Sequence, residues 1–546
     1  MTEPRRGVSL SDGTIVLCFV AALIAVRVLG SLILPVFDDA FITFRYARNL
    51  AAGNGFLYNP GEWVLGTTSP AFGLITSIFF LAGLPVPDAV VVLNIACDAA
   101  LLVSAMRLLA KESGREAAWI FGGLFIASPI FTRIAVGGME VNLFLLLGFV
   151  AVRLYHGGRE YAAVTLAAVC YFLRPESAML VAIFCITELV TGRRGRALGM
   201  AALALACVLP GLALIHVTYG SIIPQSVAAK SLIPPQPHVA IFRQLLAPDP
   251  LSLVVLPFAI HGAVMAVRRG GILRTIVWWG GSYLVAYGLA RPMVWLWYGV
   301  ATYFAVLLLA APALYSALGR FRAAGRLLSP RLLPTLMVAL PLLVWTGIAL
   351  VRGRDDATFR VYEPLQRWCR EGRIPASARI AAYDVGAIGY YADTYIYDLA
   401  GLVWPEAARR RFDYAEIVAR YKPEYLYLSA TKETAEWTGR PEIRRLYTPI
   451  ARFSKFGLTG LEVDTALLRS EWVQDYFLFK RRDVPSVRDT TEKAGSPEGW
   501  VGRSPSLVRS AGSSKERPPA GHIDRKLPVR CNSPSSSSTI TSAICC

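Results

Sequence analysis

Two adjacent carboxylates, Asp38 and Asp39, stand out as residues that could do acid–base chemistry. They begin a stretch in which apolar residues recur at helical spacing from Phe37 onward, as expected of an amphipathic helix in a membrane interface. Acids at a helix start can satisfy its free N–H groups, so one interpretation is simple N-capping. Because one cap needs only one acid, the pair also indicates a general base that accepts a proton from a hydroxyl.

Other charged residues could support such a site. Glu140, in a Gly-Gly-Met-Glu turn, could orient an acceptor or help to hold a divalent cation, or it is an ordinary loop acid. Arg45 follows the paired acids and could support the acceptor or a metal in the same way. Cations near helix ends suit a phosphate group, although such side chains also extend to lipid headgroups. We assign this phosphate-binding role to Lys230, Arg174 and Arg291.

The composition is that of an integral membrane protein. Of the 546 residues, 54% are hydrophobic and 17% are charged, which is more apolar surface than a soluble fold of this size could bury. The formal net charge of +18 would indicate nucleic acid in a soluble protein. Here the Arg residues cluster in short loops between apolar runs, which is the orientation signal of membrane insertion, so we expect no nucleic-acid partner.

Apolar runs predict about eleven transmembrane helices, at residues 14–34, 88–110, 117–135, 141–155, 161–173, 177–190, 197–217, 251–267, 272–290, 296–318 and 332–351. A further apolar run at residues 68–84 is ambiguous. If it crossed the membrane, all the basic loops after it would change sides. We therefore interpret it as a re-entrant or interfacial helix.

The basic loops then share one side with the N-terminus, which the positive-inside rule makes the cytoplasm. Their clusters include Arg107 and Lys111, Arg153 and Arg159, Arg193 to Arg196, Arg268 to Arg274, and Arg320 to Arg331. The paired acids and the candidate cations all fall on the outer side. The aromatic residues Tyr219, Trp295, Trp297 and Tyr298 are interpreted as an interfacial belt.

After Val351 the composition becomes that of a soluble domain. Segments such as ARIAAYDVGAIGYYADTYIYDLAGL and PEYLYLSA indicate strands separated by turns, with helical stretches near 358–371 and 413–421. The tail is rich in Ser, Pro, Arg and Gly, which is typical of disorder. We therefore divide the chain into a membrane domain at 1–354, an extracytoplasmic α/β domain at 355–480 and a disordered tail at 481–546.

Several motifs together resemble one family. In chain order they are FDDAFITFRYARNLAAGNGFLYNPGE, TTSP, GGMEVNLF, YFLRPESAML, TYGSIIPQSVAAKS and AYDVGAIGYYADTYIYDLAGL. They resemble the multi-spanning glycosyltransferases of the GT-C type, among them mycobacterial arabinofuranosyltransferases and relatives of protein O-mannosyltransferases. The first motif is the most specific, because paired acids after the first helix mark that superfamily. Two departures concern the acceptor and the sugar: Ile223-Pro224-Gln225 replaces an expected Pro-Asn-Thr, and Val141 replaces the usual Thr.

The resemblance implies an inverting glycosyltransferase of the bacterial inner membrane. Such enzymes take a sugar from a polyprenyl-phosphate donor and pass it, on the outer face, to a hydroxyl of an envelope glycan, lipid or protein. They require no nucleotide or other cofactor, and a divalent cation is compatible with the acids present. The resemblance also suggests the first acid as the base. Asp38, which shares a helical face with Arg45 and Asn49, is therefore assigned proton abstraction, and Asp39 support.

Two other classes of function compete with this one. A polyprenyl-linked glycan transporter or flippase predicts internal repeats and ionisable groups along a path through the bilayer, whereas the charges here gather at one interface. A scaffold without chemistry leaves the paired acids unexplained. Two charges do lie deep in apolar runs, Arg27 and Asp98, at depths that differ by only about 5 Å. Because an isolated charge there is costly, we predict that these two residues form a structural ion pair.

Overall fold

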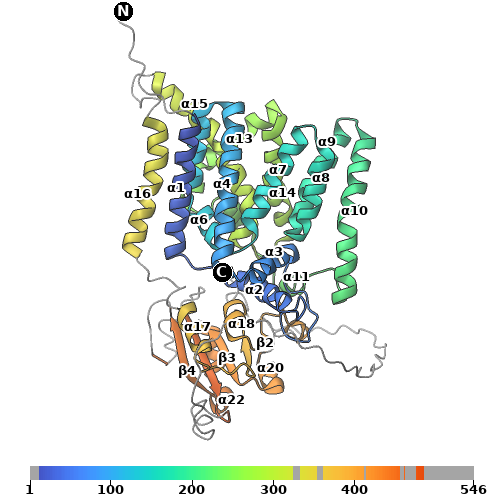
Figure 1. Ribbon diagram of the computed structural model, residues 1–546, viewed down its shortest axis with the longest axis vertical. Helices are drawn as coiled ribbons and strands as arrows, with labels where there is room; N and C mark the ends of the chain where they lie inside the picture. Colours follow the sequence, from blue (N-terminus) through green and yellow to red (C-terminus); the bar gives the residue numbers. More distant parts are fainter. Residues whose placement is uncertain are drawn as a thin grey trace, which may run out of the picture.

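The chain forms a bundle of long helices that stands on a small sheet domain (Figure 1). The computed structural model describes residues 12–323, 332–352, 361–410, 414–454, 460–461 and 475–484. The predicted boundary at 354/355 and most of the predicted disordered tail lie outside the described residues.

Every apolar run named above contains helix. The bundle consists of α1 (Asp12–Ile33), α4 (Val86–Ser113), α5 (Arg115–Ala127), α6 (Pro129–Val136), α7 (Val141–His156), α8 (Glu160–Val169), α9 (Ala178–Val190), α10 (Arg194–Tyr219), α13 (Pro250–Arg269), α14 (Gly271–Ala290), α15 (Val300–Ala323) and α16 (Leu332–Arg352). Within the described residues, six helices are long and apolar enough to cross a membrane, and the pair α5–α6, bent by 58°, makes a seventh if it forms one broken span. The chain is a multi-pass membrane protein, while the count of eleven spans stays a prediction.

Short helices lie between the bundle helices in the sequence. They are α2 (Asp38–Ala51), α3 (Pro70–Leu81), η1 (Cys170–Phe172), η2 (Pro175–Ser177), α11 (Gln225–Lys230), α12 (His238–Leu246) and η3 (Leu296–Gly299). Two of them, α2 and α11, contact the sheet domain. The 12 residues of α3 extend only about 18 Å, less than a bilayer core. Its outer side exposes the apolar stripe Leu74, Ile78 and Leu81. Both features agree with the prediction of an interfacial helix at 68–84.

The predicted ion pair inside the bundle is confirmed. Arg27 Nε of α1 lies 2.9 Å from Asp98 Oδ2 of α4, and both side chains are fully buried. Arg27 also donates to the hydroxyl of Thr132 at 2.6 Å, and Asn142 donates to Asp98 Oδ1 at 2.6 Å. Because these partners come from different helices, the buried network fixes how α1, α4, α6 and α7 pack.

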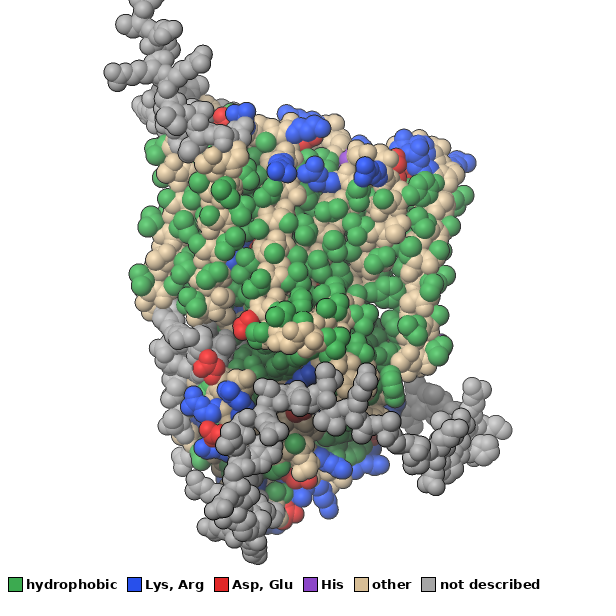
Figure 2. Space-filling view, in the orientation of Figure 1, with side chains coloured by type: hydrophobic (Ala, Val, Ile, Leu, Met, Phe, Trp, Pro, Cys, Tyr) green, Lys and Arg blue, Asp and Glu red, His purple; other side chains and the backbone are tan. Residues whose placement is uncertain are grey.

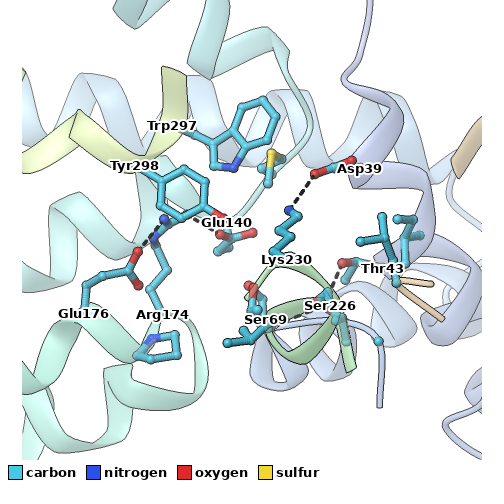
Figure 3. Close-up of a pocket in the computed structure, with 18 residues that line it drawn as sticks. Asp39, Thr43, Ser69, Glu140, Arg174, Glu176, Ser226, Lys230, Trp297 and Tyr298 are labelled. Atoms are coloured by element: carbon cyan, nitrogen blue, oxygen red, sulfur yellow. Dashed lines mark hydrogen bonds and ion pairs between the residues drawn. The ribbon is translucent and has the colours of Figure 1, made fainter. Parts of the chain in front are cut away.

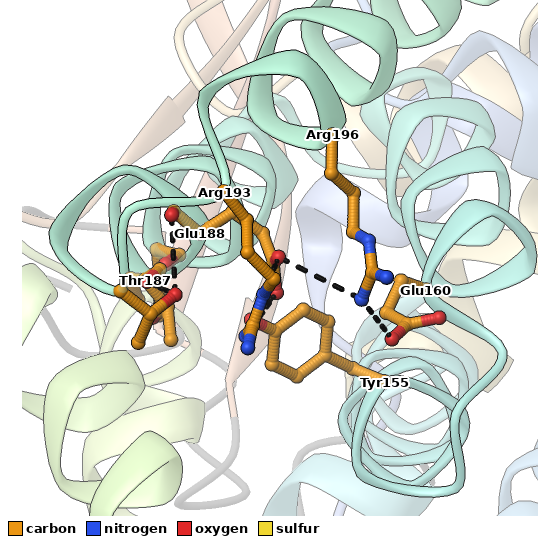
Figure 4. A network of polar contacts seen from close by, with 8 residues as sticks. Tyr155, Glu160, Thr187, Glu188, Arg193 and Arg196 are labelled. Carbon is orange, nitrogen blue, oxygen red and sulfur yellow. Dashed lines mark hydrogen bonds and ion pairs between the residues drawn. The ribbon is translucent and has the colours of Figure 1, made fainter.

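A second network ties α10 to its neighbours at the end of the bundle far from the sheet domain (Figure 4). The Glu188 carboxylate of α9 accepts from Arg193 Nε at 2.5 Å and from the Tyr155 hydroxyl at 2.6 Å. Arg196 of α10 donates to Glu160 of α8 at 2.8 Å. At its opposite end, α10 stops at Gly220, whose φ of 75° suits glycine, and the chain turns toward α11.

The sheet domain contains one five-stranded sheet in the order β2-β1-β3-β5-β4. The strands are β1 (Arg379–Ala382), β2 (Tyr395–Asp398), β3 (Tyr425–Ser429), β4 (Tyr447–Ser454) and β5 (Asp475–Arg481). β1 lies parallel to β2 and β3, whereas β5 runs antiparallel to β3 and β4. The helices around the sheet are α17 (Glu363–Arg370), α18 (Gly386–Ala392), α19 (Pro405–Arg409), α20 (Tyr414–Tyr421), α21 (Lys432–Thr438) and α22 (Pro441–Leu446). The fold class, a helical membrane protein with a C-terminal α/β domain, is therefore as predicted.

Candidate active site

The two adjacent acids face different parts of the molecule, because successive residues on a helix point about 100° apart. Asp38 Oδ2 accepts the backbone N–H of Gly386 at 2.7 Å, and its Oδ1 accepts that of Ala387 at 2.8 Å. Asp38 therefore binds the first turn of α18 in the sheet domain. Asp39 instead lines a pocket between the bundle and the sheet domain.

The pocket encloses about 200 Å³ and is built from segments far apart in the sequence (Figure 3). α2, the loop before α3, the start of α7, η2, α11 and η3 all contribute to it. Its lining residues are Asp39, Ile42, Thr43, Gly66, Thr67, Thr68, Ser69, Met139, Glu140, Arg174, Pro175, Glu176, Ser226, Val227, Lys230, Trp297, Tyr298 and Leu402.

A cation faces the acid of α2 across this pocket. Lys230, the last residue of α11, points toward Asp39, with Nζ 4.0 Å from Oδ2 (Figure 3). Burial acts to lower the pKa of Lys230, but Tyr298 and Asp39 beside it raise that pKa above its ordinary value. The Lys230 ammonium is therefore charged at neutral pH. Gln225 anchors α11 by donating its backbone N–H to the carbonyl of Leu65 at 2.7 Å.

A second charged group occupies the other side of the pocket. Arg174 donates to Glu140 at 2.8 Å and to Glu176 at 2.8 Å, and all three side chains are largely buried. The Tyr287 hydroxyl donates to Glu176 at 2.7 Å. Burial raises the pKa of Glu140, and the Arg174 guanidinium opposes this rise. Because Arg174 already has two carboxylate partners, it offers less net positive charge to a ligand than Lys230 does.

Neutral side chains complete the wall, and the sequence did not single them out as site residues. Ser226 Oγ is buried and has no hydrogen-bond partner within the described part of the chain. Thr43 and Thr67 share a hydrogen bond of 3.0 Å between their hydroxyls. The belt interpretation is wrong for Trp297, which is only 7% exposed, and Tyr298 beside it lines the pocket as well. The TTSP and QSVAAK motifs were the available signals, since both contribute lining residues.

Four of the predicted site residues meet in the pocket: Asp39, Glu140, Arg174 and Lys230. Asp38, Arg45 and Arg291 do not line it. Arg45 is buried and donates to backbone carbonyls of the sheet domain, and Arg291 ends α14 and donates from Nε to the carbonyl of Gln236 at 2.9 Å. The catalytic, phosphate-binding and supporting roles of all seven residues stay predictions, but the geometry favours Asp39 over Asp38 as the acid that meets a ligand.

The environment of Asp38 differs from that of its neighbour. Burial, with the nearby Asp384 and Asp39 carboxylates, raises the pKa of Asp38 to about 8, although the two backbone N–H donors oppose this rise. Within the described residues, no three His, Cys, Asp or Glu side chains gather so that they could hold a metal ion. The predicted compatibility with a divalent cation stays untested.

Solved structures of known proteins share this architecture. ArnT from Cupriavidus metallidurans, in a crystal structure bound to undecaprenyl phosphate, is 13% identical to the chain, with a TM-score of 0.58 over 86% of this chain and 98% of that one. Its apo structure matches equally. The fold is that of the GT-C glycosyltransferases. The family resemblance expected from the motifs is thus confirmed at the level of the fold, which is all that 13% identity shows.

More distant similarities add no further argument. The Archaeoglobus fulgidus oligosaccharyltransferase is 12% identical, with a TM-score of 0.46 over 82% of this chain and 75% of that one. Residues 353–476 match a family described as Domain of unknown function (DUF8728), which coincides with the sheet domain. No curated protein matches the chain in sequence.

Proposed function

We propose that the chain is an inverting glycosyltransferase that moves a sugar from a polyprenyl-phosphate donor to a hydroxyl of an envelope glycan, lipid or protein. The observation that carries the proposal is the facing pair of Asp39 and Lys230 in one pocket of a GT-C fold. A carboxylate and an ammonium are the two groups that this reaction needs, one for the acceptor proton and one for the leaving phosphate.

The two residues have distinct roles in the proposed reaction. The acceptor oxygen attacks the anomeric carbon from the face opposite the phosphate, a new C–O bond forms, and the bond to the phosphate oxygen breaks. Asp39 takes the acceptor proton as attack proceeds. Lys230 stabilises the negative charge that remains on the polyprenyl phosphate. Displacement from the opposite face inverts the anomeric configuration.

The Glu140–Arg174–Glu176 group is suited to orient a substrate rather than to neutralise a phosphate. Its single guanidinium is paired with two carboxylates through short hydrogen bonds, so the group has no excess positive charge. Carboxylate oxygens and the unpartnered Ser226 hydroxyl are natural partners for sugar hydroxyls. Trp297, whose ring stacks on that of Trp295, and Tyr298 add aromatic surface to the same pocket.

The donor class and the sidedness rest on two further supports. The solved ArnT structure contains undecaprenyl phosphate, so a sugar linked to a polyprenyl phosphate is the first donor to test on this related fold. Lys and Arg side chains gather at the end of the bundle far from the sheet domain (Figure 2), and they include the basic last turn of α13 and the first turn of α10. By the positive-inside rule we propose that this end is cytoplasmic and that the pocket opens outside.

A transfer assay tests the proposal. Purified wild-type protein in lipid nanodiscs is supplied with radiolabelled polyprenyl-phosphate sugars and an envelope extract as acceptor. We expect label to move to the acceptor and the Asp39→Asn variant to transfer it about 10²- to 10⁴-fold more slowly, as general-base loss does. Translocation of the donor across the bilayer without transfer would instead favour a flippase, and full activity of Asp39→Asn would remove Asp39 as the base.

A further inference from the structure

Hydrogen bonds from α2 and the loop that follows it join this region to the sheet domain. Arg45 donates to the carbonyls of Gly389 and Thr394 at 2.9 and 2.6 Å. Asn59 donates to the carbonyl of Ile396 at 2.9 Å and accepts its backbone N–H at 3.1 Å. All these donors and acceptors lie in the two motifs FDDAFITFRYARNLAAGNGFLYNPGE and AYDVGAIGYYADTYIYDLAGL. The two motifs therefore form the two sides of one interface between the domains, which we call the joint.

At one end of this joint the two backbones are in close contact. A Cβ placed on Gly386 would lie 1.8 Å from the backbone oxygen of Asp38 and 2.6 Å from its Oδ2, so only glycine fits there. The Asp38 carboxylate spans the remaining gap with its two bonds to the start of α18. Among the described residues, the titratable groups around it are Asp39, Asp384, Tyr58, Tyr362, Tyr427 and Tyr476.

The other end of the joint forms part of the pocket wall. Leu402 of the sheet domain lines the pocket, and its loop is held because Asp398 accepts the backbone N–H groups of Ala400 and Val403 at 2.8 and 2.6 Å. Gly66 lies against this loop so closely that a Cβ would meet the Val403 side chain at 2.5 Å. The sheet domain therefore contributes to one side of the pocket through Leu402.

We propose that Asp38 is a positioning residue, which holds α18 against the first turn of α2 and so sets where the Asp39 carboxylate stands in the pocket. The inference rests on the proposed function, in which Asp39 is the base. The sheet domain is then a fixed component of the catalytic unit rather than a separate module that carries the acceptor.

Two substitutions loosen this contact from opposite sides. Asp38→Asn replaces one of the two carboxylate oxygens, each of which accepts a backbone N–H group, by an N–H₂ group that faces that donor. Gly386→Ala forces α18 away without changing Asp38. Because small displacements of a reacting group are costly, each should lower kcat by about 10²-fold while binding of undecaprenyl phosphate is retained. Gly460→Ala is the matched control in the same domain, since no heavy atom of the described residues lies within 4 Å of its new Cβ.

A cross-link distinguishes positioning from chemistry. Arg48 and Asp393 form an ion pair of 2.6 Å across the joint, with side chains 27% and 67% exposed, so cysteines at these two positions can be bridged by a short bismaleimide. The bridge should restore at least tenfold of the lost activity to Asp38→Asn. It should restore little to Gly386→Ala, because the added methyl group still occupies the space of the contact. It should restore none to Asp39→Asn. A bridged Asp38→Asn protein that stays inactive, or an unbridged one at the wild-type rate, would overturn the inference.

Failure of the proposed function has a different signature. If the wild-type protein transfers no sugar from any donor, that function is wrong, and the joint is then tested by limited proteolysis of the sheet domain. Faster cleavage of both Asp38→Asn and Gly386→Ala than of the Gly460→Ala control supports the holding role of Asp38. Equal cleavage rates in all three variants would overturn it.

Discussion

Lys230 Nζ and Asp39 Oδ2 lie 4.0 Å apart, on helices that are far from each other in the sequence. This spacing exceeds a hydrogen bond, so the two groups attract each other without the carboxylate fixing the ammonium. An ammonium has three N–H donors, which leaves capacity for phosphate oxygens. The pair therefore places a base and an anion-binding group next to each other in the wall of the pocket.

The first prediction concerns donor binding. Lys230→Gln removes the charge but keeps a polar side chain of similar length, so undecaprenyl phosphate should bind about 10- to 100-fold more weakly, as expected for one charged hydrogen bond. Asp39→Asn should bind it at least as tightly as the wild type. Titration of the lipid phosphate by tryptophan fluorescence measures both. Arg291→Gln is measured beside it, because Arg291 lies outside the pocket and should contribute less. An affinity of Lys230→Gln equal to that of the wild type would contradict the role of Lys230.

The second prediction concerns the buried pair in the bundle. Removing one partner leaves a buried charge without its counter-ion, so Arg27→Leu or Asp98→Leu should each cost about 3–5 kcal/mol of stability. The double variant should cost less than the sum, because it leaves no unpaired charge. Thermal unfolding in detergent micelles measures the three variants. Strictly additive losses would show that the two side chains do not stabilise each other.

The third prediction concerns sidedness. The basic loops and the sheet domain lie at opposite ends of the bundle. A reporter fused in the loop at residues 193–196 should therefore read cytoplasmic, and one inserted after Gly401 should read periplasmic. The control is a reporter at the N-terminus, which should agree with the first. If the loop and sheet-domain reporters agree with each other instead, the proposed orientation is wrong.

Much of the fold could be predicted because its signals are local. Long apolar runs specify the bundle helices, and Arg27 and Asp98 had to pair because each is costly alone at its depth. β1, β2 and β3 were predictable because each coincides with a run of apolar and aromatic residues in the sequence. The sequence did not predict β4. Its register shifts between Pro449 and Ala451, and the proline interrupts the alternation of apolar and polar residues that marks a strand.

The site was less predictable, because non-local contacts determine it. Helical geometry says that Asp38 and Asp39 point apart, but not which of them meets a ligand. That choice depends on Gly386, which lies in the other domain and whose missing side chain lets α18 approach Asp38. Arg45 was predicted to support the acceptor or a metal because it follows the paired acids. In the structure it donates to two carbonyls of the sheet domain and so joins the two domains. Trp297 was interpreted as an interfacial residue because aromatic side chains near helix ends are common at membrane surfaces. In the structure it lines the pocket.

The last prediction concerns pH and the joint between the domains. The pKa of Asp38 rises from 3.8 to about 8 in the folded protein, so between these values the folded state binds a proton that the unfolded state has released. The stability contributed by this proton is fully present below about pH 4 and is lost as the pH rises toward 8. The urea midpoint of the sheet domain, followed by tryptophan fluorescence, should therefore fall between pH 5.5 and 8.5. Burial also raises the pKa of Asp398 to about 7, so this residue likewise makes the urea midpoint fall as the pH rises.

Asp38→Asn has no such proton to lose, so its midpoint should fall less than that of the wild type over the same range. Equal slopes in the two proteins would show that Asp38 does not titrate within the joint.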